Sequence, residues 1–210
     1  NAFTGAVTLN TTGSSGDVIV DNGTTTLDIA ASSVGGDLTL TSGNASGITD
    51  SGTVTVGDDL TVTTDANSGA IDLGTLAVDG DIAITTHGSG AATVVNDANL
   101  KLAASTVGGA LNATATTGNI TDSGALTVAG SSTFVTGADG ADIKLDTATN
   151  AFSDSVTLKA GSSGNRTFDD ITFVDSGAVT IQTSAATDAD GELLIDGSTD
   201  GAVGGDLSVR

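Results

Sequence analysis

The chain contains no cysteine, proline, methionine, tryptophan or tyrosine. The absence of cysteine excludes disulfide bonds and thiolate metal sites. The absence of proline leaves every backbone amide able to donate a hydrogen bond, which suits strands that pair along their whole length. Five phenylalanines supply all of the aromatic side chains, and Lys and Arg together also number five. The composition therefore does not favour a β-helical polysaccharide lyase or hydrolase, because such enzymes need a groove with basic and aromatic residues.

Positive charge is scarce as well. Acidic residues outnumber basic ones by 26 to 5, which gives a formal net charge of −21. Such a chain is repelled by nucleic acid and by anionic membrane surfaces, so we expect neither as a partner. The charge favours solubility and attracts cations. No run of about 18 apolar residues occurs, so we expect no transmembrane helix and no insertion into a membrane.

Residues for catalysis are few. His87 is the only histidine, in the turn sequence Thr86-His87-Gly88. One histidine without cysteine cannot build a zinc site, and no serine lies in a recognisable nucleophile motif. We expect no enzymatic activity, no catalytic residues and no organic cofactor.

The dominant pattern is a short alternation of aliphatic and polar residues that returns about every eleven residues. A period of two predicts half-buried strands, and the Gly, Asn, Asp and Ser between them predict turns. No segment has a sustained helical period, so we expect essentially no helix. Equivalent strands begin at Leu38, Leu60 and Ile82, at a constant interval of about 22 residues, and we expect the next ones at Leu111 and Phe134.

This interval is too short for helical crossovers and fits stacked coils of two or three short strands each. The sequence predicts an all-β fold, a right-handed parallel β-helix with coils of about 20–24 residues. It would form one continuous solenoid over residues 1–210. We expect the aliphatic residues Leu38, Leu40, Leu60, Val62, Ile82 and Ile84 to point inward, and Thr39, Thr41, Thr61, Thr63 and Thr85 to point outward. The phenylalanines are expected to fill the interior: Phe3, Phe134, Phe152, Phe168 and Phe173.

Longer copies also recur. Leu100–Thr114 matches Leu27–Thr41 at 9 of 15 positions, and the I-T-D-S-G of Ile48–Gly52 returns unchanged at Ile120–Gly124. The start of the chain, Asn1-Ala2-Phe3 with Val7-Thr8-Leu9, returns inside it as Asn150-Ala151-Phe152 with Val156-Thr157-Leu158. Because the chain begins in the phase of an internal repeat, we expect it to be a segment of a longer repetitive protein.

The most regular polar feature is an aspartate directly before a strand, at Asp37, Asp59 and Asp81. Stacked coils would place these carboxylates about 4.8 Å apart, where neighbours repel by roughly 1 kcal/mol in water. Either each carboxylate caps turn N–H groups, which we favour, or Ca²⁺ bridges neighbouring carboxylates. Asp188 and Asp190 belong to a second cluster, whose D-A-D-G-E sequence resembles an incomplete calcium loop. Acidic turns are the favoured interpretation here too, with calcium sites as the alternative.

The outward threonines allow a further alternative. Flat T-x-T arrays on ice-binding β-helices resemble this face. In the sequence the array is interrupted by Ala83, Asn112 and Lys159. We therefore expect an ordinary solvated strand face and keep ice binding as an alternative.

The tandem units of the types I-T-D-S-G-x-L-T-V and A-S-x-V-G-G-x-L resemble the repeats of filamentous haemagglutinin-like exoproteins. These are large adhesins of Gram-negative bacteria, often exported by two-partner secretion. The resemblance implies a β-helical rod on the cell surface and no functional residues in the repeat region. It departs from the family in one respect, because the Asn-Pro-containing secretion motifs have no match in a chain without proline.

Together these observations predict an extracellular structural or adhesive rod, or a filament-forming segment, of a large bacterial surface protein. Expected partners are neighbouring repeats, further copies stacked end to end and a host, cell or surface receptor. Open coil ends suit end-to-end stacking because each exposes unpaired strand edges. A β-helical polysaccharide-acting enzyme and a calcium- or ice-binding solenoid are the alternatives.

Overall fold

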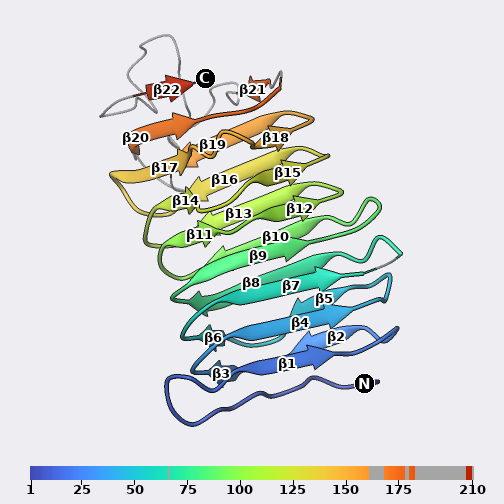
Figure 1. Ribbon diagram of the computed structural model, residues 1–210. Coiled ribbons are helices and arrows are strands. Elements are labelled where there is room, and N and C mark those ends of the chain that lie inside the picture. The colour runs from blue at the N-terminus through green and yellow to red at the C-terminus, as the bar shows by residue number, and fades with distance from the viewer. Residues whose placement is uncertain (66, 161–167, 178–179, 183–206, 210) are drawn as a thin grey trace.

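The computed structural model describes residues 1–65, 67–160, 168–177, 180–182 and 207–209 (Figure 1). These residues form strands, turns and bends, and no helix. The strands are β1 (Val18–Asp21), β2 (Leu27–Ile29), β3 (Ser32–Val34), β4 (Leu38–Ser42), β5 (Ile48–Asp50), β6 (Val54–Val56), β7 (Leu60–Thr64), β8 (Ile71–Val78), β9 (Asp81–Thr85), β10 (Ala92–Asn96), β11 (Leu100–Leu102), β12 (Ser105–Val107), β13 (Leu111–Ala115), β14 (Ile120–Asp122), β15 (Leu126–Val128), β16 (Ser132–Thr136), β17 (Ala141–Leu145), β18 (Ala151–Phe152), β19 (Val156–Ala160), β20 (Phe168–Phe173), β21 (Ile181–Gln182) and β22 (Leu207–Val209).

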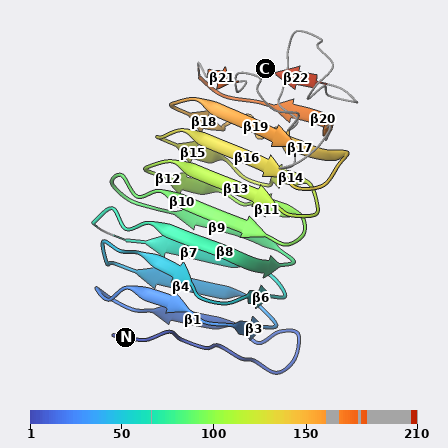
Figure 2. The same cartoon turned by 180° about the vertical axis from the view of Figure 1, so that it is seen from behind.

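The strands stack into a parallel β-solenoid, as the alternation predicts. Figures 1 and 2 show the coils one above another, with the chain climbing from the N-terminal end to β20. All strand pairs in the described residues are parallel, and they form two sheets. A sheet of twelve strands follows the order β1-β4-β7-β9-β11-β14-β17-β20-β22, with β12, β15 and β18 beside it. A sheet of ten strands follows β2-β5-β8-β10-β13-β16-β19-β21, with β3 and β6 beside it.

The interior is a set of aliphatic ladders. Leu38 pairs with Leu60, and Leu60 with Ile82, in one continuous register. These three side chains, and those of Leu40, Val62 and Ile84, are fully buried. The threonines between them face solvent in part. The predicted faces and the register over this stretch are therefore confirmed, and burial of each large aliphatic side chain contributes about 1.5–3 kcal/mol.

The predicted continuation of this ladder is wrong. Ile82 pairs with Leu102 in the next coil, while Leu111 and Phe134 lie in the opposite sheet. Leu111 pairs there with Ala92 of the coil beneath. Leu111 and Phe134 were assigned to the same sheet because their strands resemble those at Leu38 and Leu60. The two sides of a coil carry similar strands, so sequence similarity alone does not tell which side a strand occupies.

Coil length is close to the prediction in most of the rod. Along the twelve-stranded sheet, the Asn and Asp side chains that directly precede strands bond to equivalent positions 20, 22 or 23 residues further on, as far as Asp142. Register partners in the ten-stranded sheet follow one another at similar intervals from Leu27 to Val156. Beyond these points the coils lengthen, and the step from Asp142 to Asp170 spans 28 residues.

On either side of β8 and β9, one side of a coil is a single straight strand and the other side is split into two short strands by a corner. In the N-terminal half the split side, β2/β3 and β5/β6, belongs to the ten-stranded sheet. In the C-terminal half the split side, β11/β12, β14/β15 and β17/β18, belongs to the twelve-stranded sheet. The corner thus changes sides at β8 and β9.

This change of side explains the long repeat. β2, β3 and β4 are the copy of β11, β12 and β13, yet β2 lies in the ten-stranded sheet and β11 in the twelve-stranded one. From β2 the path rises three coils through β5 and β8 to β10, and β11 is the next strand on the opposite side. The two sequence copies therefore lie three and a half coils apart, and the same sequence serves in either sheet.

The phenylalanines follow the prediction only in the C-terminal half. Phe134, Phe152 and Phe173 are buried and in contact: the rings of Phe134 and Phe152 pack edge-on with centroids 6.0 Å apart, and those of Phe152 and Phe173 are tilted with centroids 5.3 Å apart. Phe3 is 44% exposed, so it does not fill the interior of the described coils as predicted. It lies in the first coil, with no described coil beneath it. The side chain of Phe168 lies outside the described part of the structure.

Candidate functional site

The aspartates predicted as a possible metal site, Asp37, Asp59 and Asp81, form a hydrogen-bonded column together with Asp17. This column is here called the aspartate ladder. In each step the Oδ1 of one aspartate accepts the backbone N–H of the next. The distances are 3.0 Å from Asp37, 3.0 Å from Asp59 and 2.8 Å from Asp81. The carboxylates therefore cap backbone N–H groups, as favoured from the sequence, but the N–H groups belong to the coil above and not to the turn of the same aspartate. Bridging by Ca²⁺ stays a prediction, and a calcium titration of the melting temperature tests it.

In the C-terminal half a second column makes the same kind of hydrogen bond, from the backbone N–H of one coil to the side-chain oxygen of the coil beneath. It consists of Asn99, Asn119, Asp142 and Asp170, here called the Asn/Asp ladder. Each side-chain Oδ1 accepts the next backbone N–H, at 2.9 Å, 2.9 Å and 3.0 Å in turn. Sequence reasoning missed this column because it looked for aspartate alone. The signal was present, since an Asn or Asp directly precedes each of Leu100, Ile120, Ile143 and Ile171.

Lys101 lies between the two columns. Its register partner is Asp81, so Lys101 occupies the position at which the next aspartate of the ladder would lie. The aspartate ladder therefore ends at a lysine. The Nζ of Lys101 lies 2.6 Å from Asp81, whose other oxygen accepts the Ser123 hydroxyl at 2.5 Å. Burial alone raises the pKa of Asp81, but the hydrogen bonds from Lys101 and Ser123 and the lysine charge outweigh it and lower that pKa. The hydrogen bond to Asp81 and the charge of that carboxylate raise the pKa of Lys101.

The aspartate of each I-T-D-S-G unit also accepts backbone N–H groups of the coil above, in this case at a corner. Asp50 accepts the backbone N–H groups of Gly74 and Thr75, at 2.9 Å and 2.7 Å, and the Thr75 hydroxyl. Its copy Asp122 accepts the N–H groups of Asp146 and Thr147, at 3.0 Å and 3.2 Å. Each carboxylate thus holds two successive amides of the coil above. The unchanged recurrence of the motif was the sequence signal for this role.

Buried polar side chains complete the hydrogen bonding where a split coil meets a straight one. The Ser105 hydroxyl accepts the N–H of Ile84 at 3.0 Å and donates to the Ala103 carbonyl. Its copy Ser32 accepts the N–H of Leu9 at 2.9 Å and donates to the Ala30 carbonyl. Buried asparagines accept N–H groups in the same way: Asn22 from Phe3, Asn96 from Val78 and Asn150 from Leu126. These polar side chains thus satisfy amides that would be costly to leave unpaired when buried.

Two glycines let the corners approach each other closely. A Cβ on Gly35 would lie 1.9 Å from the Gly13 carbonyl oxygen, and one on Gly108 would lie 2.2 Å from that of Gly88. The first glycine of the V-G-G sequence in both copies is therefore required for close packing between coils.

The other candidates from the sequence are placed as follows. Asp188 and Asp190 lie outside the described residues. His87 is exposed in a turn, as predicted, and its Nδ1 lies 2.6 Å from the Thr64 carbonyl oxygen. Of the residues thought to interrupt the threonine face, Asn112 and Lys159 belong to the ten-stranded sheet and Ala83 to the twelve-stranded one. An outward column of threonines therefore continues through five coils: Thr41, Thr63, Thr85, Thr106 and Thr127.

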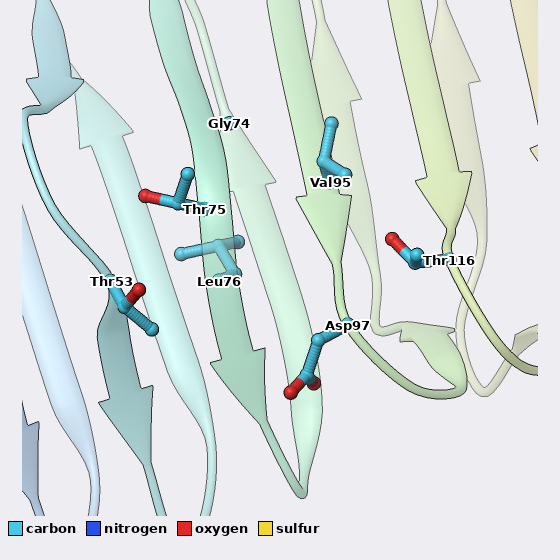
Figure 3. Close-up of a pocket in the computed structure, with 7 residues that line it drawn as sticks. All are labelled: Thr53, Gly74, Thr75, Leu76, Val95, Asp97 and Thr116. Atoms are coloured by element: carbon cyan, nitrogen blue, oxygen red, sulfur yellow. The ribbon is translucent and has the colours of Figure 1, made fainter.

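A shallow hollow on the outer surface lies over the bulge in β8. There β8 advances from Leu73 to Leu76 while its partner β10 advances only from Val94 to Asn96. Figure 3 shows the hollow between the hydroxyls of Thr53, Thr75 and Thr116 and the carboxylate of Asp97. Asp97 is the one ionisable residue among those that line it. A pair of carboxylates for general acid and base catalysis is thus not assembled there.

Within the described ranges, no group of three or more His, Cys, Asp or Glu side chains is arranged to hold a metal ion. The same ranges contain no helix long and apolar enough to cross a membrane. The two ladders and the aspartates of the I-T-D-S-G units bond mainly to backbone groups of neighbouring coils. The chemistry that this arrangement supports best is attachment of one coil to the next.

Comparison with known proteins places these coils in a family. The family described as repeats of unknown function (DUF5649) matches residues 15–75 and 89–159. Neither the curated proteins nor the solved structures contain a match to the chain. The starts of the two matched segments are separated by nearly the same interval as the two copies of the long repeat. The matched segments cover more than half of the sequence, so the chain belongs to this family of repeats.

Proposed function

We propose that this chain is a structural, non-catalytic rod segment of a large bacterial surface protein, which projects or connects adhesive parts or assembles into a filament. The observation that carries the proposal is the use of its regular polar residues. Asp37, Asp59 and Asp81 lie at positions where an enzyme could place acids, yet each accepts or completes a hydrogen bond between coils. A surface whose polar groups serve its own stacking is suited to length and stiffness.

The architecture supports the same proposal. Strand pairing joins each described coil only to its neighbours, so adding coils lengthens the rod without altering its interior. The charge of −21 keeps such a rod soluble and prevents its sides from associating. The resemblance of the repeats to filamentous haemagglutinin-like exoproteins leads us to propose an extracellular location, with a cell or surface receptor as the partner.

Electron microscopy of the full-length protein is the first test of this proposal. We expect thin, unbranched rods whose length increases with the number of repeats. Compact globules would contradict it. Depolymerisation of an acidic polysaccharide by the purified protein would instead establish the enzymatic alternative, and Asp97→Asn, at the only carboxylate of the hollow, would then be the first variant to assay.

One observation favours a second candidate. The column of five threonines on the twelve-stranded sheet is uninterrupted, and Thr39 and Thr61 extend it to a small two-dimensional array. Ice-binding β-helices present such arrays to water. Thermal hysteresis that Thr63→Lys abolishes and Thr93→Lys, on the other sheet, leaves intact would establish this function. Absence of hysteresis would exclude it.

A further inference from the structure

Two segments of the chain with the same sequence pattern occupy comparable places, one at the N-terminal end of the rod and one inside it. They are the first coil, with Asn1, Phe3, Val7 and Leu9, and the internal copy, with Asn150, Phe152, Val156 and Leu158. Their contacts to the coil above agree. The N–H of Phe3 donates to Asn22 Oδ1 at 2.7 Å, and that of Phe152 donates to Asp175 Oδ1 at 2.9 Å.

The internal copy also makes a full set of contacts to the coil beneath it. Asn150 Oδ1 accepts the N–H of Leu126 at 2.8 Å, and its Nδ2 donates to Asp122 at 2.6 Å. The ring of Phe152 packs edge-on against Phe134, with centroids 6.0 Å apart. Asn150 is fully buried and Phe152 is 3% exposed.

The first coil carries the same side chains with nothing described beneath them. Phe3 is 44% exposed, against 3% for Phe152. Asn1 is also exposed, and its amino group donates to the Asp21 carbonyl in the coil above. The exposed Phe3 ring and the exposed Asn1 side chain lie at an open sheet end, and the unpaired backbone groups of such an end can pair with a further strand.

We propose that the N-terminal end of the rod is an interface for one further coil of the I-T-D-S-G type, the kind formed by residues 120–149. Such a coil presents a carboxylate to the Asn1 amide, as Asp122 does to Asn150. It presents a backbone N–H to the side-chain Oδ1 of Asn1, as Leu126 does to that of Asn150, and an aromatic interior to Phe3, as Phe134 does to Phe152. The inference deepens the proposed rod function, because it names the partner of one end.

The fit is specific because the copy defines the register. In the internal copy Thr149 directly precedes Asn150. A coil joined to Asn1 in the same way would continue both the aliphatic ladders and the hydrogen bonding of the split side. A coil without an aspartate at the position of Asp122 would leave the Asn1 amide without its buried acceptor, which is unfavourable.

The test is a fusion in which residues 120–149 are added directly before Asn1 of the full chain. We expect the added coil to raise the melting temperature and to protect the amide at its Leu126 position from hydrogen exchange. Phe3→Ala should lower the melting temperature of the fusion by roughly 6 °C or more, since burial of a phenylalanine is then lost. In the chain without the added coil, the same substitution should have almost no effect.

A fusion with the same segment in scrambled order is the matched control and should give no gain. Equal, small effects of Phe3→Ala in both chains would overturn the inference. So would association of the unfused chain through Phe3 in sedimentation without a gain in the fusion, because the end would then accept a different partner. Either failure leaves the rod proposal to be judged by microscopy of the full-length protein.

Discussion

The two halves of the rod contain nearly the same repeats but use them on opposite sides. Ser32-Ser33-Val34 forms a short strand of the ten-stranded sheet, and its copy Ser105-Thr106-Val107 forms one of the twelve-stranded sheet. The serine of each copy makes the same pair of hydrogen bonds. The comparison teaches that the structural unit is the half coil. A split side packs against a straight side whether the split side lies in the ten-stranded or in the twelve-stranded sheet.

The junction shows what the exchange of sides requires. β8 pairs with both short strands, β5 and β6, beneath it and with the straight β10 above it. β9 pairs with the straight β7 beneath it and with both β11 and β12 above it. One strand in each sheet thus pairs with two short strands on one side and with a single long strand on the other. In β8 this arrangement includes a β-bulge, a feature that is common where a strand bends.

The largest expected effect tests whether the two sides are equivalent. Leu38→Ala in β4 and Leu111→Ala in β13 remove copies of the same buried leucine from opposite sheets. Each should lower the free energy of unfolding by about 2–5 kcal/mol, as cavities in a packed core do. Denaturant titration of both variants measures the losses. A loss at one site several times that at the other would show that the sheets are not interchangeable.

The serines at the split sides distinguish the interior of the rod from its end. Ser105→Ala leaves the N–H of Ile84, a fully buried residue, without an acceptor, which costs about 1–3 kcal/mol. Ser32→Ala should cost less because Leu9 is only partly buried and water reaches the first coil. Chemical denaturation with the exposed Ser33→Ala as control checks this order. Equal costs would contradict the distinction.

The aspartates of the I-T-D-S-G units should also differ between the halves. Asp122→Ala removes acceptors for two amides and for the fully buried Asn150, whereas the groups that Asp50 accepts are solvent-exposed. We expect a loss of about 1–2 kcal/mol at Asp122 and less at Asp50. Hydrogen exchange of the Thr147 amide in Asp122→Ala, and of the Thr75 amide in the Asp50→Ala variant, reports the two sites separately. Faster exchange at Thr75 without a change at Thr147 would contradict the prediction.

One position carries opposite charges in the two copies. Lys101 pairs with Asp81, while its copy Asp28 has an Oδ1 atom that is buried without a hydrogen-bond partner among the described residues. Asp28→Thr should therefore stabilise the chain by about 1 kcal/mol, since an unsatisfied acceptor is removed. Thermal melting compared with Asp72→Thr, an exposed aspartate in the same row, isolates the effect. Destabilisation by Asp28→Thr would show that the carboxylate has a partner in solution.

The smallest effect is the pH dependence of the ion pair at the junction. The pKa of Asp81 is lowered from 3.8, so its contribution is present above that value and is lost as the pH falls through its folded-state pKa. The pKa of Lys101 is raised from 10.5, so its contribution is present below that value and is lost as the pH rises further. Solvent screens the exposed lysine, so the pair contributes little to stability.

Lys101→Met therefore should lower the melting temperature slightly at neutral pH and not at either extreme. Lys144→Met, at the more exposed pair with Asp146, is the control and should change it less. A difference between wild type and Lys101→Met that persists below the folded-state pKa of Asp81 would show that the lysine acts through packing rather than charge.

The amino-acid sequence by itself determined the fold class, the coil length and the two faces of the strands. The alternation around Leu38, Leu60 and Ile82 leaves only one way to bury the aliphatic residues, and it fixes which threonines face water. It also placed the aspartate ladder, because a carboxylate before each strand recurs at the coil interval.

Only the tertiary structure decided the sheet to which each copy belongs, the partners of the buried serines and asparagines, and the exposure of Phe3. Leu111 was assigned to the wrong sheet because half coils have similar patterns, so local sequence leaves their side open. Phe3 and Phe152 share their sequence context, yet one is exposed and the other buried. What differs is the coil beneath them, and a contact between coils depends on both partners rather than on either sequence alone.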